Sequence, residues 1–311
     1  MDISIVIVSY NVAEYLDRCL ESIRKEMRRQ HEIIVVDNGS SDDSLLVVKA
    51  KHPRSIIIQN GQNRGFAAAN NQGFQKASGK YVFLLNPDTL VLEGSVDKLA
   101  DFMDWHPEIG ISGPRNLNPD GSLQMNCHHF PTLTGVLWDY LQFRRYFPRS
   151  RIFGREHMTY WDYDDTREVD WITGSSLMIR KEILNELGGL DEGFFMYSEE
   201  CDLCYRARKA GWMTAFIPEA AIIHFGGQSA LAEKEFNLQD RMILEHFFQS
   251  RYYFFRKHYG RLREVGLKII TVIYYGISFI KNRILLRKKG RVERMKAART
   301  IIRQSLAGRN P

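Results

Sequence analysis

The sequence lacks the two kinds of segment that commonly carry a chain out of the cytoplasm or into a bilayer. It begins MDISIVIVSYN, without the basic stretch and the small-residue cleavage site of a secretory signal peptide. The apolar stretch at residues 269–280 has 12 residues, whereas a membrane-spanning helix needs about 20. Both absences favour a cytoplasmic location.

Cysteine is scarce, which limits the metal and redox chemistry that the chain can support. The four cysteines are Cys19, Cys127, Cys201 and Cys204. The last two form a C-x-x-C pair, but no second pair or histidine cluster follows at ligand spacing, so we expect no structural zinc site. This cysteine usage fits a reducing compartment.

Two familiar nucleotide-binding signatures are also missing. No G-x-G-x-x-G follows the first predicted strand, which excludes the dinucleotide-binding fingerprint. The segment from Gly73 to Lys80 comes closest to a Walker loop, but it is one residue too long and precedes a strand. A nucleotide would therefore have to be bound in another way.

Positive charge is unevenly distributed along the chain. The net charge is +6, yet residues 251–311 contain 17 Lys and Arg against two acidic residues, Glu264 and Glu293. This tail therefore carries +15 and the rest of the chain −9. A basic tail on an acidic body suggests a polyanionic partner, either nucleic acid or anionic lipid.

Short apolar runs alternate with helical patterns, most clearly in the first 90 residues. The predicted strands cover residues 3–8, 33–36, 55–58, 81–85, 171–180 and 213–217. Apolar residues recur at helical spacing after the first strand, where Asn11 and Glu14 resemble a capping pair, and residues 66–77 form a second predicted helix. The pattern predicts an α/β fold with a mostly parallel, Rossmann-like central sheet flanked by helices.

The first four predicted strands all end in polar clusters. These clusters are Ser9 to Asn11, Asp37 to Asp42, Asn60 to Gly65 and Asn86 to Asp88. Turns favour such residues for their own reasons, but ligands bind beyond the carboxyl ends of strands in open α/β sheets. Four clusters on one edge therefore predict a binding site. The aromatic-rich residues 115–170 are either a lid facing an acceptor or a satellite core beneath a long loop.

Six segments occur along the chain in the order SIVIVSYN, IIVVDNGSSDDS, NRGFAAANNQG, YVFLLNPDT, GGLDEGFFMYSEECDLCYRARKAGW and PEAAIIHFGGQS. Taken together and in this order, they resemble the family 2 glycosyltransferases with the GT-A fold, particularly their bacterial rhamnosyltransferase-like branch. The resemblance covers roughly residues 3–260. It implies a GT-A catalytic domain at residues 1–250, followed by a basic, mainly helical region at residues 251–311.

The resemblance also implies a pocket for the donor nucleotide. Asp37 would accept a hydrogen bond from the imide N–H of uracil or thymine, and Tyr10 would pack against the base. The backbone around Ser9 and Asn11 would complete this pocket. A second set of residues would lie near the phosphates, at a glycine-containing turn that opens a helix; it comprises Asn63, Gly65 and Asn70.

The metal motif of the family is usually Asp-x-Asp, and here it reads Asn86-Pro87-Asp88. One carboxylate is therefore replaced by an amide, whose carbonyl can still face a hydrated cation or the ribose. Mg²⁺ and Mn²⁺ prefer oxygen ligands and often use one or two carboxylates together with donor phosphates. His224 matches the histidine that many relatives bring to the same metal. We therefore expect Mg²⁺ or Mn²⁺ at Asp88 and His224.

Sugar transfer needs a base that takes the proton of the attacking hydroxyl. The resemblance assigns this role to Glu200 in the run Ser198-Glu199-Glu200-Cys201-Asp202, with Asp202 as the alternative base. Acidic residues are also favoured at helix N-termini by the helix dipole alone. Glu199, Gly174 and Ser175 are expected near the sugar and the acceptor. Because a single displacement needs no nucleophilic side chain, we expect inversion at the anomeric carbon.

The expected reaction is transfer of a sugar, with rhamnose as one candidate, from a dTDP- or UDP-sugar to a glycan or lipid-linked acceptor during cell-surface polysaccharide synthesis. Basic residues follow the apolar stretch of the tail, which predicts a helix on the anionic inner face of the cell membrane. These residues are Lys281, Arg283, Arg287, Lys288 and Lys289. Packing of the tail in a homo-oligomer is the alternative. Two other functions stay open at this point, a sugar nucleotidyltransferase and a nucleic-acid-binding protein.

Overall fold

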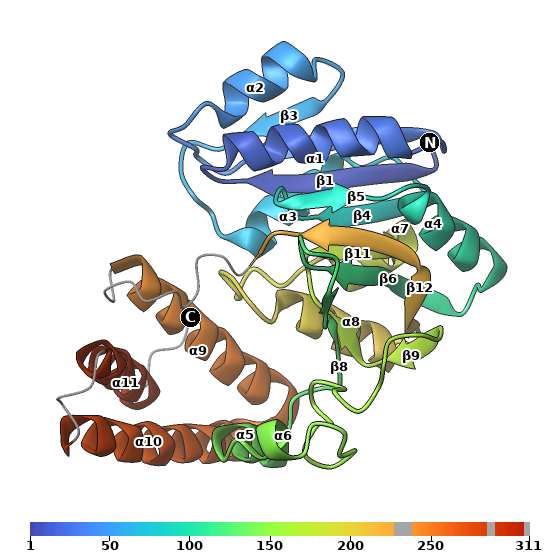
Figure 1. Ribbon diagram of the computed structural model, residues 1–311. Coiled ribbons are helices and arrows are strands. Elements are labelled where there is room, and N and C mark those ends of the chain that lie inside the picture. Colours follow the sequence, from blue (N-terminus) through green and yellow to red (C-terminus); the bar gives the residue numbers. More distant parts are fainter. Residues whose placement is uncertain (227–237, 285–289, 308–311) are drawn as a thin grey trace.

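The computed structural model describes residues 1–226, 238–284 and 290–307, and it places a sheet-centred body beside a group of long helices (Figure 1). The sheet begins with β1 (Ile3–Ser9), which pairs in parallel with β2 (His31–Asp37) and β4 (Tyr81–Leu85). β3 (Ile56–Gln59) pairs in parallel with β2. Every residue of β1 is buried, as expected for β-branched residues covered on both faces. The four predicted strands of this half are confirmed.

The other half of the sheet mixes strand directions. The path β3-β2-β1-β4 continues through β11 (Ser176–Arg180), β6 (Ile109–Leu117), β12 (Met213–His224) and β5 (Thr89–Val91). β11 is antiparallel to β4 and β6, whereas β12 is parallel to β6 and antiparallel to β5. The short strands β7 (Leu123–Gln124) and β9 (Arg167–Val169) pair with β6 and β12. β12 therefore runs in the same direction as β1, and both end at the same edge of the sheet.

Helices cover both faces of the sheet. One core contains the apolar faces of α1 (Ala13–Glu26), α2 (Ser44–Lys51) and α4 (Ser95–Trp105). The opposite core contains those of α3 (Phe66–Lys76), α7 (Lys181–Leu187) and α8 (Glu199–Lys209). Alternate residues of β1 supply each core, Ile5 on one face and Val6 on the other. This arrangement confirms the expected α/β sheet flanked by helices.

The aromatic-rich residues 115–170, called the insertion below, contribute to the core and also contact the long helices. Trp161 and Tyr163 are stacked at 4.3 Å and are buried against Phe216 of β12. Farther out, Tyr140 stacks on Tyr274 at 4.5 Å. The elements of this insertion are β8 (Cys127–His128), paired with β10 (Trp171–Ile172), and the helices α5 (Leu133–Tyr140) and α6 (Phe143–Tyr146). Part of the insertion is thus core beneath a long connection.

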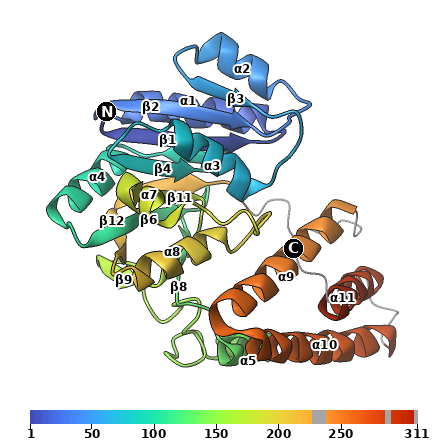
Figure 2. The ribbon, with the colours of Figure 1, turned by 180° about the vertical axis from the view of Figure 1, so that it is seen from behind.

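The helical region comprises α9 (Leu238–Tyr259), α10 (Arg261–Ile284) and α11 (Arg291–Leu306). α8 lies between the sheet and α9 (Figure 2), and a third core joins Cys201 of α8 to Phe248 and Phe254 of α9. The boundary predicted at residue 250 falls inside α9. Within the described ranges, none of the helices combines the length and apolarity that a bilayer crossing requires.

Candidate active site

The carboxyl ends of β1 and β2 carry a cluster of polar side chains, some of which are buried. The side chains of Ser9 and Asp37 are 0% and 3% exposed, and Tyr10 beside them is half exposed. Asp37 Oδ2 accepts a hydrogen bond from the backbone N–H of Ser40 at 3.4 Å. Asp37 Oδ1 and Ser9 Oγ are shielded from solvent and have no hydrogen-bond partner among the described residues. Buried polar atoms are nearly always paired, so these two atoms indicate a ligand that supplies the partner.

The loop after β2 holds the start of α1 in place. Asn11 has a left-handed φ of 55°, and its Oδ1 accepts a hydrogen bond from the N–H of Ser41 at 2.7 Å. Asp42 Oδ2 accepts the N–H of Ala13, and Ser44 Oγ accepts that of Val12. The predicted capping pair of Asn11 and Glu14 is therefore wrong, because the caps come from a neighbouring loop. Asn11 instead ties the ends of β1 and β2 together.

The loop between β3 and α3 is fixed by close packing. Asn63 Oδ1 accepts hydrogen bonds from Asn38 Nδ2 at 3.0 Å and from the N–H of Gly65 at 2.9 Å. Gly65 has φ +86°, and a Cβ there would lie 2.6 Å from the carbonyl oxygen of Phe195. The same oxygen accepts the N–H of Phe66. The N–H groups of Gly65 and Phe66 are thus used within the protein.

Asn70 is buried in α3 at 1% exposure, and its amide donates to the carbonyl of Phe66 at 2.9 Å. Its contact in this structure is therefore with its own helix. The proximity of Asn63, Gly65 and Asn70 to phosphate stays a prediction.

The residues predicted to hold the metal lie next to each other, although 136 positions separate them in sequence. The pairing of β5 with β12 sets His224 opposite Thr89, beside Asp88. His224 Nε2 lies 3.4 Å from Asp88 Oδ1. Adjacent ligands of an octahedral Mg²⁺ at about 2.1 Å are about 3 Å apart, so these two atoms fit one cation. Asn86 Oδ1, at the end of β4, is buried and unpaired within the described part of the chain.

The first turn of α8 begins from strained backbone. Tyr197 and Ser198 have φ values of 71° and 67°, and side chains of this kind occupy the left-handed region at a cost of about 1 kcal/mol or more each. Glu199 and Glu200 follow directly. Such strain persists only where packing enforces it, and it is frequent at functional sites.

Only one of the two carboxylate oxygens of Glu200 has a side-chain hydrogen bond among the described residues. Its Oε1 accepts a hydrogen bond from the N–H of Gly174 at 3.1 Å, whereas its Oε2 is shielded and has no described partner. Burial raises the pKa of Glu200 above its ordinary value. Burial, followed by the charge of Glu200, raises the pKa of Glu199 well above its ordinary value. Two adjacent carboxyl groups in one desolvated site cannot both ionise easily.

Asp202 has a very different environment, although it lies on the same turn. Its side chain is fully buried and contacts Arg206 Nε at 2.7 Å, Lys257 Nζ at 2.6 Å and His258 Nε2 at 2.7 Å. Burial alone would raise its pKa, but His258, Arg206 and Lys257 together lower it to about 2. Asp202 therefore joins α8 to α9.

One backbone segment connects the metal motif to Glu200. The carbonyl oxygen of Ser175 accepts the N–H of Asn86 at 2.9 Å, while the preceding residue, Gly174, donates to Glu200. Ser175 Oγ accepts the amide of Asn116 at 2.8 Å, which fixes the segment on β6. The structure thus brings together Asn86, Gly174, Ser175 and Glu200. The pattern of the sequence gave no signal for Asn116.

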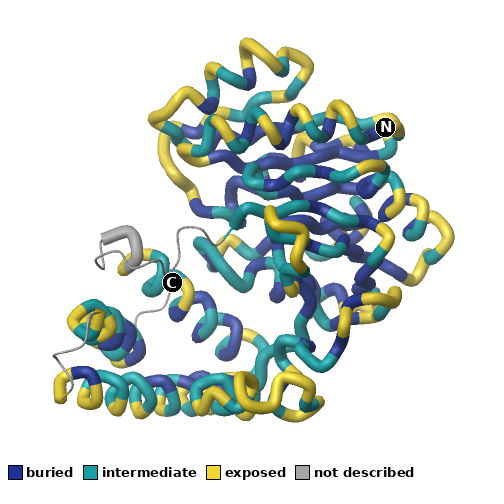
Figure 3. The backbone as a smooth tube through the Cα atoms, viewed as in Figure 1, coloured by how far each residue is buried: buried dark blue, intermediate teal, exposed yellow. Residues whose placement is uncertain are grey.

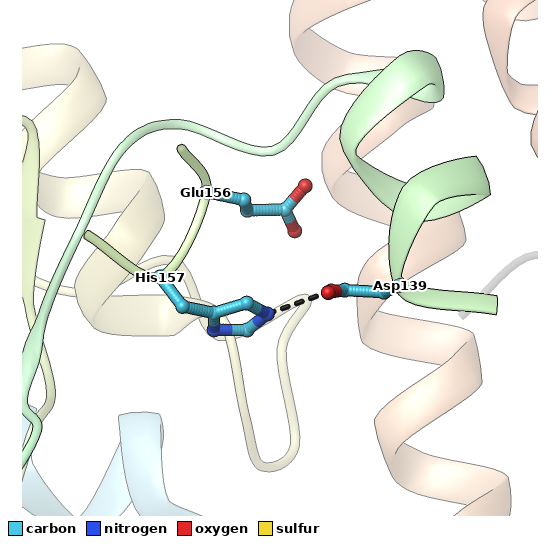
Figure 4. Close-up of side chains that lie close together, drawn as sticks. All are labelled: Asp139, Glu156 and His157. Carbon is cyan, nitrogen blue, oxygen red and sulfur yellow. Dashed lines mark hydrogen bonds and ion pairs between the residues drawn. The ribbon is translucent and has the colours of Figure 1, made fainter. Parts of the chain in front are cut away.

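A second group of potential metal ligands lies in the insertion, formed by Asp139, Glu156 and His157 (Figure 4). His157 Nε2 is 2.7 Å from Asp139 Oδ2. Asp139 also pairs with Arg144 at 3.1 Å, and Glu156 pairs with Arg251 of α9 at 2.9 Å. Each carboxylate therefore already has a cationic partner, and these ion pairs attach α5 to the neighbouring elements. Glu156 Oε2 is buried without a hydrogen-bond partner among the described residues.

Solved structures with similar architecture support the fold assignment. The chain resembles the mannosyltransferase PcManGT from Pyrobaculum calidifontis, solved in complex with GDP-Man and Mn²⁺. The TM-score is 0.57 at 14% sequence identity, and the match covers 98% of this chain and 86% of the other. The site therefore lies on a glycosyltransferase fold of the GT-A type.

The chain belongs to glycosyl transferase family 2, because residues 4–188, more than half of its length, match the model of that family. It is 28% identical over 244 residues to an N-acetylglucosaminyl-diphospho-decaprenol L-rhamnosyltransferase of Mycobacterium tuberculosis, covering 72% of this chain and 76% of the relative. It is 26% identical over 231 residues to the rhamnosyltransferase WbbL of Escherichia coli K12, covering 71% and 82%. Membership of the family favours a glycosyltransferase over the nucleotidyltransferase and nucleic-acid-binding alternatives.

Proposed function

We propose that this protein is a metal-dependent, inverting glycosyltransferase that uses Glu200 as its base. The donor would be a dTDP- or UDP-sugar, with rhamnose as the first sugar to test, and the acceptor a hydroxyl of a glycan or lipid-linked glycan in cell-surface polysaccharide synthesis. The observation that carries this proposal is the segment of Gly174 and Ser175, which connects the carboxylate of Glu200, with its unpaired Oε2, to the Asn86–Asp88 motif. Two similar proteins with rhamnosyltransferase names support the choice of sugar.

The donor base would occupy the pocket at the ends of β1 and β2. Its imide N–H would donate to the unpaired Oδ1 of Asp37, while Tyr10 would cover one face of the ring. Asn11 would act indirectly by fixing the loop that closes the pocket. Uracil and thymine offer the same imide, so this pocket accepts either.

The diphosphate would lie beside Asp88, His224 and Asn86, whose carboxylate, imidazole and amide carbonyl suit Mg²⁺ or Mn²⁺. Bound there, the cation would offset the negative charge that develops on the departing nucleoside diphosphate. Asp88 supplies the single carboxylate of the set, so we expect metal affinity to rise when the donor phosphates are present.

Glu200 would then accept the proton of the acceptor hydroxyl. The hydroxyl oxygen forms a bond to the anomeric carbon, the bond from that carbon to the diphosphate oxygen breaks, and its electron pair leaves with the nucleotide. Attack opposite the leaving group inverts the configuration. The hydrogen bond from Gly174 holds one carboxylate oxygen, which leaves Oε2 to take the proton.

A thermal-shift screen of nucleotide sugars, with and without Mg²⁺ or Mn²⁺, tests the donor and metal assignments. A ligand that binds only the folded protein raises its stability, so one dTDP- or UDP-sugar should raise the melting temperature, more so with metal. Asp88→Ala should remove the metal-dependent part of the shift. Full metal-dependent transfer by Asp88→Ala would refute the metal assignment.

We also propose that α10 rests on the anionic inner face of the membrane, close to a lipid-linked acceptor. Five isoleucines of α10 are spaced three or four residues apart and are 54% to 76% exposed; they are Ile269, Ile273, Ile277, Ile280 and Ile284. Exposed positions recur along the side of α10 that faces away from α9 and α11 (Figure 3). The opposite face packs on α9 and α11 and buries Leu267 and Thr271. Lys281 and Arg283 lie in the last turn of the helix. Arg287, Lys288 and Lys289 follow in the sequence, outside the described residues. Apolar residues beside basic ones are typical of interfacial helices.

Sedimentation with lipid vesicles tests this surface. Ile273→Glu/Ile277→Glu should reduce binding to phosphatidylglycerol-containing vesicles at least tenfold, whereas Leu46→Glu, an equally exposed position on α2, should not. Neutral phosphatidylcholine vesicles should bind the native protein more weakly, since each basic residue near an anionic surface contributes about 1 kcal/mol. Unchanged binding by the double variant would overturn the proposal. A dimer in solution that this variant disrupts would instead identify the isoleucine row as an oligomer contact.

A further inference from the structure

Gln124 contacts the ring of His224 on the side away from Asp88. Gln124 lies on β7, opposite Asn116 of β6, and its Oε1 is 2.6 Å from His224 Nδ1. The other ring nitrogen, Nε2, is the one that faces Asp88. The two nitrogens of one imidazole therefore have separate partners, an amide on one side and the carboxylate of the candidate metal site on the other.

Neighbouring hydrogen bonds fix which way the amide of Gln124 points. Its Nε2 donates to Asn118 Oδ1 at 3.0 Å and to the carbonyl oxygen of His224 at 3.2 Å. Asn118 Nδ2 in turn donates to Ser122 Oγ and to the carbonyl of Leu123, which leaves its Oδ1 as an acceptor. Exchanging N and O in either amide would break these bonds. The atom of Gln124 that meets His224 is therefore an oxygen, which can only accept a hydrogen.

We propose that Gln124 is a positioning residue that holds His224 with its hydrogen on Nδ1, so that the lone pair of Nε2 is aimed at the cation shared with Asp88. This inference deepens the proposed function and rests on its metal site. Histidine ligands commonly donate their second ring N–H to a fixed acceptor, and removal of that acceptor typically costs 10- to 100-fold in metal affinity. Here the acceptor comes from a two-residue strand that the sequence did not reveal.

A purely structural role for Gln124 would give different results. Its bond to the carbonyl of His224 also attaches β7 to β12, so a variant could weaken this corner of the sheet without affecting the ring. Gln124→Glu separates the two roles, because a carboxylate still accepts the hydrogen of Nδ1 but cannot donate to the carbonyl. Gln124→Met keeps the length of the side chain and loses both functions.

The experiment has two readouts on folded, full-length protein. Nitrogen-15 NMR of histidine-labelled protein at pH 8, without metal, should place a hydrogen on Nδ1 of His224 in the native chain and in Gln124→Glu. In Gln124→Met only Asp88 Oδ1 remains as an acceptor beside the ring, so the hydrogen should move to Nε2. Calorimetric titration with Mn²⁺ in the presence of UDP or dTDP should show 10- to 100-fold weaker binding for Gln124→Met and less than about threefold for Gln124→Glu.

The outcomes separate this inference from the proposed function. An Nδ1 hydrogen that is unchanged in Gln124→Met, or equal losses of Mn²⁺ affinity in both variants, would overturn the role of Gln124. If the native protein bound no Mn²⁺ even with nucleotide, the proposed metal site would fail, and the NMR experiment would still decide whether Gln124 sets the tautomer.

Discussion

The two sides of the first turn of α8 carry acidic side chains whose pKa values are shifted in opposite directions. On the side that faces the sheet edge, Glu200 has one hydrogen bond from Gly174, an unpaired oxygen and a raised pKa. On the side that faces α9, Asp202 contacts Arg206, Lys257 and His258 and has a pKa of about 2. Two residues along a helix differ by about 200° in direction. Packing, rather than residue type, therefore separates a carboxylate suited to take a proton from one that anchors a helix.

The largest effect is expected from substitution of Glu200, and it should be on turnover. Glu200→Gln removes the proton acceptor but keeps the shape, so turnover should fall about 10²- to 10⁴-fold while donor affinity stays within about twofold. Glu200→Asp keeps the acid on a shorter arm and should retain more activity than Glu200→Gln. Steady-state transfer rates, with calorimetry of donor binding, measure both. Wild-type turnover by Glu200→Gln, with loss in Asp202→Asn, would move the base to Asp202.

On the Asp202 side the expected loss is one of stability. Asp202→Asn leaves Arg206, Lys257 and His258 without their buried anion, which should cost about 3 kcal/mol in the free energy of unfolding. Urea denaturation measures this difference. Lys98→Gln removes an exposed cation that donates to the carbonyls of Glu93 and Glu219, so it serves as a control and should change stability by less than about 0.5 kcal/mol. A fully stable Asp202→Asn would show that Arg206, Lys257 and His258 do not need this carboxylate.

The contribution of Asp202 should also depend on pH. Its pKa is lowered in the folded protein to about 2 from an ordinary 3.8, so its stabilisation is complete above about pH 4 and is lost as the pH falls toward 2. The difference in unfolding free energy between the native chain and Asp202→Asn should therefore shrink by about 2 kcal/mol over this window. A constant difference from pH 5 to pH 2.5 would contradict the charge network.

The smallest effect is expected at Gly174, beside Glu200. A Cβ there would lie 3.5 Å from the Cβ of Glu200, an ordinary contact, so Gly174→Ala should change the unfolding free energy by less than about 1 kcal/mol. Gly65→Ala is the contrasting variant, because its Cβ would meet the carbonyl of Phe195 at 2.6 Å and its φ is positive. It should destabilise by more than 1 kcal/mol. Equal melting temperatures for the two variants would contradict the close packing of Gly65 against Phe195.

Local patterns predicted the first four strands, because buried strands such as β4 are marked by continuous apolar residues that depend little on distant neighbours. They missed β6 and joined β10 and β11 into one strand at residues 171–180. The polar cluster at Asp37 followed from where β1 and β2 end. The juxtaposition of Asp88 and His224 did not follow from any local pattern, since the pairing of β5 with β12 joins distant segments. Resemblance to a family predicted that Asp88 and His224 lie together, and in the structure His224 Nε2 is 3.4 Å from Asp88 Oδ1.

Other parts of the site depend on contacts that no local rule describes. The capping prediction at Asn11 failed because the loop after β2 supplies the caps. Gly65 was interpreted through phosphate binding, whereas its close approach to Phe195 becomes visible only in three dimensions. Asp202 was expected as the alternative base, and no local pattern indicated its contacts with Lys257 and His258, because these residues lie on the distant helix α9. No sequence pattern indicated that Gln124 belongs to the site.

The pH dependence of turnover tests the central claim most directly, that Glu200 rather than Asp202 takes the proton. With Glu200 as the base, kcat should fall as the pH decreases through a value above the ordinary glutamate pKa, because the carboxylate becomes protonated. With Asp202 as the base, whose pKa is about 2, kcat would stay level down to the pH at which the protein unfolds. A fall in kcat through a pKa above 4.5 that disappears in Glu200→Gln is the predicted result, and a level profile would contradict it.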